Sequence, residues 1–167
     1  MNIILIGMPL SGKTAIGRRL SEELSIQHID LDKEIECTFG KSVYELFLKF
    51  GECHFRKIES ECFKKIDLES SSIVSIGGGA SNRLNSEFIS LYERRIWLQC
   101  SVEEAANRYQ ESKEKRPLLY NANNLIDKWC KLYEERKMFF KNLSNIIIDT
   151  TDLDINSSAD KVIMAMR

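Results

Sequence analysis

A glycine-rich segment near the start of the chain has the composition and spacing of a phosphate-binding loop. The segment Gly7-Met-Pro-Leu-Ser-Gly12-Lys13-Thr14 matches G-x-x-x-x-G-K-[ST], and it lies between a strand-like run and a helical pattern. Its backbone N–H groups and the positive end of the next helix would face phosphate oxygens. Lys13 would contact the β/γ-phosphates and the Thr14 hydroxyl would ligate Mg²⁺. The motif predicts a nucleotide site but not its use, since GTPases, ATPases and small-molecule kinases all carry it.

Two acidic residues and a glycine triplet follow later strand-like runs. Asp30 and Asp32 end the run His28–Leu31, where they would point to the same side of a strand, one pleat apart. Ligands bind at the C-terminal edge of a parallel sheet, so one carboxyl group would serve Mg²⁺ and the other a substrate hydroxyl. Either residue could instead cap the following helix. The triplet Gly77–Gly79 would let a ligand approach the backbone closely, or would form a flexible turn.

Arginines in apolar helical rows predict an anion site. Arg136 interrupts the apolar stripe of a helical pattern at about residues 122–141. A desolvated guanidinium needs an anion, unless the side chain extends to solvent from the stripe's edge. Arg56 lies in a similar row, and Glu59 would orient it if the two are more than a surface pair.

A polar run, Gln110–Arg116, is the best candidate for a mobile segment, although an ordinary solvated loop would have the same composition. Arg116 ends this run and precedes a proline. From that position it would swing onto a phosphate, or remain a surface residue by chance.

Composition and periodicity predict one α/β domain. The 167 residues fit one domain, and 43% of them are hydrophobic. A formal net charge of −1 argues against a strongly basic nucleic-acid binder, and there is no apolar run of about 18 residues to span a membrane. Five cysteines without a C-x-x-C pair indicate reduced thiols in the cytoplasm. Short apolar runs alternate with helical patterns, which predicts an open parallel sheet. These runs are Asn2–Gly7, His28–Leu31, Ile73–Gly77, Arg95–Gln99 and Asn145–Asp149.

In combination, the motifs resemble the shikimate kinase family of nucleoside-monophosphate-kinase-like P-loop proteins. The resemblance covers nearly the whole chain in order. It rests on Gly7–Thr14 followed by Gly17–Leu20, on Asp30–Asp32, Gly51–Glu59, Gly77–Ala80 and Arg116–Leu119, and on Tyr133 with Arg136. It implies a three-layer α/β/α fold whose five parallel strands have the order 2-3-1-4-5, with a mobile lid.

The resemblance also implies a reaction and a set of site residues. The reaction is transfer of the ATP γ-phosphate to the 3-hydroxyl of shikimate, with Mg²⁺, in a single domain over residues 1–167. The lid would span about residues 109–121 and the substrate-binding helices about residues 32–62. Shikimate would bind Asp32, Arg56, Gly78, Gly79 and Arg136, with both arginines on its carboxylate. The nucleotide would bind Leu10, Ser11, Gly12, Lys13, Thr14, Ala15, Arg108 and Arg116, with Arg108 stacked on adenine. Asp32, Lys13 and Arg116 would act in catalysis, and Thr14 and Asp30 would hold the metal, Asp30 through water.

Three positions depart from the family pattern, and two other functions stay open. Leu10 stands where relatives usually carry Gly, Ala15 where a second hydroxyl is common, and Phe140 where Tyr is usual. One alternative is a kinase of the same fold for another small alcohol, such as gluconate, or for a nucleotide. The other is a regulator that binds nucleotide without catalysis, against which the presence of Lys13 and Asp32 argues. We expect a cytoplasmic monomer without a nucleic-acid or membrane partner.

Overall fold

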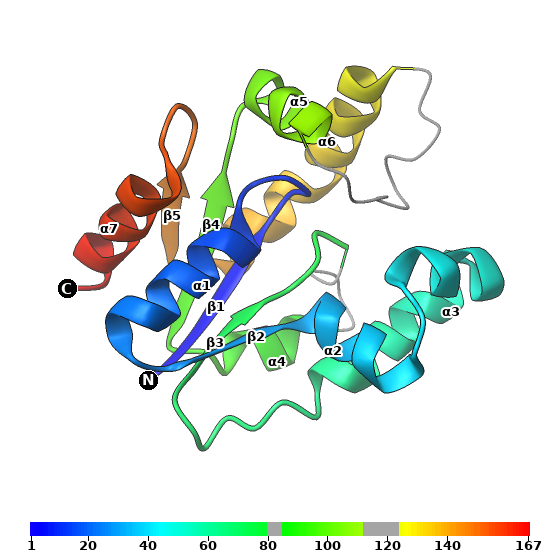
Figure 1. The fold of residues 1–167 in the computed structure, drawn as a ribbon, viewed down its shortest axis with the longest axis horizontal. Coiled ribbons are helices and arrows are strands. Elements are labelled where there is room, and N and C mark those ends of the chain that lie inside the picture. The colour runs from blue at the N-terminus through cyan, green and yellow to red at the C-terminus, as the bar shows by residue number, and fades with distance from the viewer. Residues whose placement is uncertain (80–84, 112–123) are drawn as a thin grey trace.

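Strands in the described part of the chain form one parallel sheet. The structure is a computed structural model that describes residues 1–79, 85–111 and 124–167. The strands are β1 (Asn2–Gly7), β2 (Gln27–Asp30), β3 (Ser72–Ser75), β4 (Arg94–Gln99) and β5 (Ile146–Asp149). They pair in the order β2-β3-β1-β4-β5, all parallel (Figure 1). The predicted order is confirmed, and the strand ends differ from the expected ones by no more than one or two residues.

Helices cover both faces of the sheet and make the predicted three layers (Figure 1). One face packs against α1 (Lys13–Leu24) and α7 (Ile155–Met166). The other packs against α2 (Leu31–Phe39), α3 (Val43–Phe63), α4 (Ser86–Ser90), α5 (Val102–Glu111) and α6 (Leu125–Leu143).

The central strand explains why the apolar runs do not alternate with polar residues. Ile3 and Leu5 join the core under α1 and α7, whereas Ile4 and Ile6 join the core on the opposite face. All four side chains are fully buried. A parallel strand covered on both faces needs apolar residues at every position.

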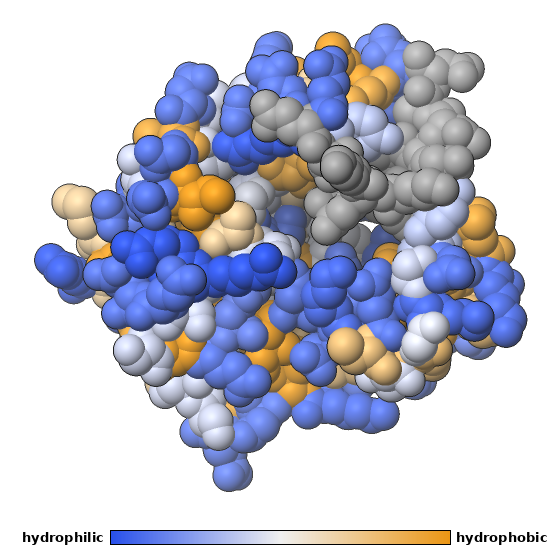
Figure 2. Space-filling view, viewed as in Figure 1, coloured by the Kyte–Doolittle hydropathy of each residue, from blue (hydrophilic) through white to orange (hydrophobic). Residues whose placement is uncertain are grey.

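The visible surface is largely polar (Figure 2), and the described helices are unsuited to spanning a membrane. Figure 2 shows one face of the molecule on which hydrophilic residues predominate over scattered apolar ones. Within residues 1–79, 85–111 and 124–167, no helix combines the length and the apolar character needed to cross a bilayer.

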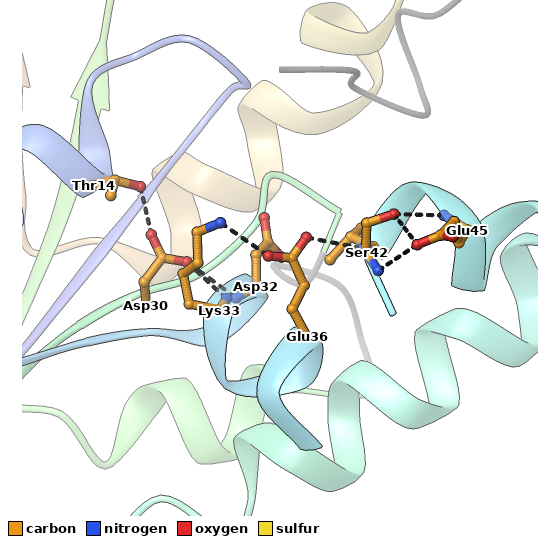
Figure 3. A network of polar contacts seen from close by, with 8 residues as sticks. Thr14, Asp30, Asp32, Lys33, Glu36, Ser42 and Glu45 are labelled. Atoms are coloured by element: carbon orange, nitrogen blue, oxygen red, sulfur yellow. Dashed lines mark hydrogen bonds and ion pairs between the residues drawn. The ribbon is translucent and has the colours of Figure 1, made fainter. Parts of the chain in front are cut away.

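Two glycines and a capping box set the bounds of α2 and α3. Gly40 ends α2 with φ 62°, and Gly51 interrupts α3 with φ 73° and ψ 167°, conformations that favour glycine. Ser42 and Glu45 form the reciprocal capping box at the start of α3 (Figure 3). The break at Gly51 divides α3 into two segments, of which the second carries Arg56 and Glu59.

Candidate active site

Side chains from the phosphate loop itself, from α5 and from α6 donate hydrogen bonds to the carbonyl groups of the loop. Lys13 Nζ donates to the carbonyl oxygens of Gly7 and Met8, at 3.1 and 2.7 Å. The Arg108 guanidinium donates to the Leu10 carbonyl at 3.0 Å, and the Trp129 indole donates to the Pro9 carbonyl at 3.2 Å. A loop that offers N–H groups to an anion needs donors of this kind on its carbonyl side.

Leu10 adopts the backbone conformation of a glycine. Its φ is 72°, in the left-handed region, and its side chain packs into the core with 8% exposure. A side chain costs about 1–2 kcal/mol in that region. The loop therefore keeps a glycine-like path at the position where the sequence departs from the family pattern, and burial of the Leu10 side chain offsets part of the strain.

Thr14 and Asp30 come together where a divalent cation would sit beside a nucleotide. The Thr14 hydroxyl donates to the Asp30 carboxylate at 2.5 Å (Figure 3). Thr14 ends the loop motif and lies in the first turn of α1, and Asp30 ends β2, two strands away from β1 in the sheet. Hydroxyl and carboxylate oxygens are ligands that Mg²⁺ prefers, and it takes few of them from a protein when phosphates and water supply the rest. These two residues therefore fit the predicted metal site.

The expectation that Asp30 and Asp32 share one face of a strand is wrong. Helix α2 begins at Leu31, so Asp32 lies in the first helical turn. The second carboxylate oxygen of Asp30 accepts hydrogen bonds from the backbone N–H groups of Asp32 and Lys33, at 3.1 and 3.4 Å (Figure 3). The N-cap is therefore Asp30, which ends the strand by starting the helix. Asp32 reaches the sheet edge from that helix instead.

Most of the residues predicted to bind the acid line one cavity beside the loop. It has a volume of about 300 Å³ and is lined by Arg56, Arg136, Gly78 and Gly79, together with Glu52, Glu135 and Phe139. Asp32 lies next to the same wall, because a Cβ built on Gly77 would be 3.4 Å from an Asp32 carboxylate oxygen. The five residues predicted to bind the substrate thus lie at one place, although they come from α2, α3, α6 and the chain after β3.

Arg56 is held in position by a buried acid and two aromatic rings. Its guanidinium donates to the Glu59 carboxylate at 2.7 Å and lies 5.4 and 5.8 Å from the ring centres of Phe55 and Phe47. The Arg56 side chain is 14% exposed and that of Glu59 only 1%. Burial raises the pKa of Glu59 to about 7, although the neighbouring Arg56 opposes this change. The pair is therefore not a surface pair, and Glu59 limits the conformations open to Arg56.

Arg136 shares the cavity and has a buried donor atom that no protein group satisfies among the described residues. Its Nη1 atom is buried and has no hydrogen-bond partner within the described part of the chain. Burial lowers the pKa of Arg136 and repulsion from Arg56 lowers it further, although Glu52, Glu135 and Glu59 oppose this change. Two desolvated guanidinium groups on one cavity favour an anion between them, and a carboxylate can accept hydrogen bonds from both.

Of the remaining predicted residues, some lie at the phosphate loop and others lie outside the described part of the chain. Arg108 lies beside the loop, with its guanidinium donating to Leu10, to the Thr150 carbonyl at 3.2 Å and to the Glu104 carboxylate at 2.7 Å. Ser11 is fully buried within the loop. Arg116 and most of the predicted lid, about residues 109–121, lie outside the described residues.

Two residues that contact the site were missing from the predicted set. The sequence signal for Glu59 was its spacing from Arg56, but only the structure shows its burial. Trp129 lies 120 positions from Pro9, so no local pattern indicates their contact.

Comparisons with known proteins agree with this geometry. The family model for shikimate kinase matches residues 9–167. The shikimate kinase of Flavobacterium psychrophilum is 36% identical, and the match covers 96% of this chain and 98% of that protein. The shikimate kinase of Enterococcus faecalis is 32% identical, with coverage of 97% and 94%. A solved structure, the shikimate kinase of Acinetobacter baumannii in complex with shikimate, superposes with a TM-score of 0.93 at 30% identity, covering 99% of this chain and 92% of the other. This chain therefore belongs to the shikimate kinase family.

Proposed function

We propose that this chain performs the reaction of its family, using ATP and Mg²⁺ to phosphorylate the 3-hydroxyl of shikimate, with shikimate 3-phosphate and ADP as products in aromatic amino acid biosynthesis. The observation that carries the proposal is the convergence of Arg56 and Arg136, from two separate helices, on one cavity beside the phosphate loop. The solved relative from Acinetobacter baumannii, which is a complex with shikimate, supports the same substrate.

The acid site binds the substrate through its carboxylate. Arg56 and Arg136 hold that group by charge-assisted hydrogen bonds, which are stronger than neutral ones. Gly78 and Gly79 form a wall without side chains, so that the ring of a small polyol acid can lie against the backbone. In this proposal the reacting hydroxyl points away from the arginine pair, toward Asp32, which lies beside Gly77.

Asp32 is the residue that we assign to the reacting hydroxyl. Its carboxylate accepts a hydrogen bond from that hydroxyl, orients the oxygen toward the γ-phosphorus, and takes the proton as the new bond to phosphorus forms. Phosphoryl transfer depends on positioning and charge neutralisation more than on covalent chemistry of the protein. The fixed carboxylate of the acid therefore sets which hydroxyl meets Asp32.

The nucleotide side of the site is built from the loop and its neighbours. Residues 10–15 hold the phosphates, Lys13 neutralises charge that develops on the transferred group, and Arg108 lies where the adenine would stack. Thr14 and Asp30 hold Mg²⁺, Asp30 through water. A Mg²⁺ ion held by these residues would supply positive charge that offsets the negative charge of the phosphates.

The lid and the extent of the domain belong to the same proposal and rest on the resemblance in sequence. Residues 1–167 act as one unit, with substrate-binding helices at about residues 32–62 and a lid at about residues 109–121. Arg116 reaches the transferred phosphate from this lid, whose closure excludes water and suppresses ATP hydrolysis.

A substitution at Arg136 tests the proposed function. We expect Arg136→Ala to raise the KM for shikimate by about 10- to 150-fold, the range that loss of one charge-assisted interaction corresponds to, with the KM for ATP unchanged. Arg19→Ala is the matched control, because Arg19 pairs with Glu22 and Glu23 on α1. Unchanged shikimate turnover in the Arg136 variant would overturn the carboxylate assignment.

A substrate panel separates the proposed reaction from its alternatives. ADP release is measured with shikimate, gluconate and nucleoside monophosphates. Faster turnover of a nucleoside monophosphate, which has no carboxylate, would contradict the role of the arginine pair. ATP binding without turnover of any polyol acid would instead indicate a non-catalytic nucleotide-binding regulator.

We also propose that the chain acts as a monomer in the cytoplasm. All five cysteines are unpaired, which suits a reducing compartment. Light scattering coupled to size-exclusion chromatography gives the mass in solution, and a value of twice the chain mass would contradict the monomer.

A further inference from the structure

The consecutive carbonyl oxygens of residues 7–10 in the phosphate loop all accept hydrogen bonds from side chains. Lys13 serves the carbonyls of Gly7 and Met8, and Arg108 serves that of Leu10. Between them, the Pro9 carbonyl accepts from the Trp129 indole at 3.2 Å. In the proposed function, Lys13 and Arg108 contact the nucleotide. Trp129 lies on α6 and is assigned a contact with neither the nucleotide nor the acid.

Trp129 is held firmly by its own surroundings. It is 4% exposed, and its ring stacks on Tyr133, one turn along α6, with ring centres 5.4 Å apart and an angle of 12° between the planes. A buried indole N–H that loses its partner cannot bind water instead, so breaking this hydrogen bond is costly. The bond therefore restrains both the Trp129 ring and the Pro9 carbonyl. The hydrogen bond therefore links two rigid elements.

The same helix and the same proline contact the acid site. Arg136 lies on α6 two turns after Trp129 and lines the cavity. On the other side, a Cβ built on Gly78 would lie 3.1 Å from the Pro9 ring and 3.0 Å from the Gly7 carbonyl oxygen, so Gly78 packs directly on the loop. Pro9 thus lies between the glycine wall of the acid site and the helix that carries Arg136.

We propose that Trp129 is a positioning residue of this enzyme, whose indole N–H fixes the phosphate loop through the Pro9 carbonyl in register with helix α6. The consequence is that nucleotide affinity depends on a donor that touches neither nucleotide nor acid. The inference rests on the nucleotide site of the proposed function. It does not require turnover of shikimate, because nucleotide binding is measured directly.

Trp97 provides a matched control for removing the indole N–H. It is also 4% exposed and belongs to the same aromatic cluster, with ring centres 6.4 Å from Tyr133 and 5.6 Å from Phe140. Its indole nitrogen is buried without a hydrogen-bond partner among residues 1–79, 85–111 and 124–167. Trp129→Phe and Trp97→Phe therefore remove similar ring volume, but only the first removes a hydrogen bond to the loop.

The experiment compares nucleotide binding with thermal stability. We expect Trp129→Phe to weaken MgADP binding, measured by isothermal titration, by about two- to tenfold, as loss of one neutral hydrogen bond would. We expect shikimate affinity without nucleotide to stay unchanged. Trp97→Phe, which removes ring volume but no hydrogen bond, should lower Tm by less than Trp129→Phe and leave MgADP binding unchanged. Equal MgADP affinity in wild type and Trp129→Phe, or equal weakening in both variants, would overturn the inference.

An isosteric replacement keeps the test valid if Trp129→Phe does not fold. Site-specific incorporation of 3-benzothienylalanine at position 129 replaces the N–H by sulfur and keeps the ring. The same loss of MgADP affinity is expected in this variant, and wild-type affinity would refute the role of the N–H. If wild type binds MgADP but does not phosphorylate shikimate, the proposed function fails while the positioning role of Trp129 stands or falls on binding alone.

Discussion

Replacing Gly79 by alanine should impair binding of the acid while leaving the fold nearly intact. A Cβ built at Gly79 would overlap the guanidinium of Arg56, the group assigned to the substrate carboxylate. The backbone of Gly79 lies outside the left-handed region, so alanine can adopt it. The overlap falls on the end of the Arg56 side chain rather than on backbone, so relieving it displaces Arg56 from the cavity, at a cost in stability set by its contact with the buried Glu59.

The size of the effect follows from what Arg56 loses. A charge-assisted hydrogen bond contributes about 1.5–3 kcal/mol, so a displaced guanidinium should raise the KM for shikimate by about 10- to 150-fold. The Arg56–Glu59 contact of 2.7 Å must also change, and the displaced guanidinium then no longer compensates the buried acid fully. The KM for ATP should not change, because the loop contacts of Lys13 and Arg108 lie elsewhere.

The assay measures ADP release while one substrate is varied and the other is kept saturating, which gives the KM for each. Urea unfolding is measured in parallel. Gly78→Ala is the contrasting variant, since its Cβ would meet the Gly7 carbonyl at 3.0 Å and the Pro9 ring at 3.1 Å, neither of which moves freely. We expect it to lose about 1–3 kcal/mol of stability and to affect both substrates. A folded Gly79→Ala variant with a wild-type KM for shikimate would refute the placement of Arg56.

Three further results are expected. Burial raises the pKa of Glu59 from 4.5 to about 7, so its contribution to stability is fully present below about pH 4.5 and is lost as pH rises through about 7. Between about pH 5 and about pH 8, the free energy of unfolding should therefore fall more in the wild type than in Glu59→Gln, by as much as about 3 kcal/mol in urea unfolding. Equal decreases in the two proteins would contradict the burial argument. At Leu10, the Gly variant should be more stable than the Ala variant by about 1 kcal/mol in the same assay, because only alanine keeps the strain of a positive φ; the reverse order would mean that the loop relaxes. Thr14→Val should raise the Mg²⁺ concentration for half-maximal activity by about tenfold or more, whereas Thr14→Ser should behave as wild type; equal metal dependence would remove Thr14 from the metal site.

Local patterns predicted the features that consecutive residues create by themselves. The phosphate loop depends on glycines, a lysine and a hydroxyl within one short segment between strand and helix, so the spacing was sufficient to find it. The apolar runs predicted the parallel strands, because burial on both faces leaves no alternation. The strand order came from the resemblance to a family, since periodicity does not say which strands pair.

The position of Asp32 in a helix, and not on a strand, could not be predicted from the local sequence. The sequence Asp30-Leu-Asp32 fits a strand end and a helix start equally well. The capping hydrogen bonds of Asp30 decided for the helix at Leu31, and this placed Asp32 near the glycines from a different element.

The sequence by itself determined which chemical groups this protein has and where its chain forms a phosphate loop, since both follow from residues adjacent along the backbone. Only the tertiary structure decided that Arg56 and Arg136 line one cavity, that Glu59 is buried beneath them, and that an indole from α6 restrains the loop. Burial and charge pairing between distant segments depend on how helices pack on the sheet, and no spacing along the chain encodes that packing directly.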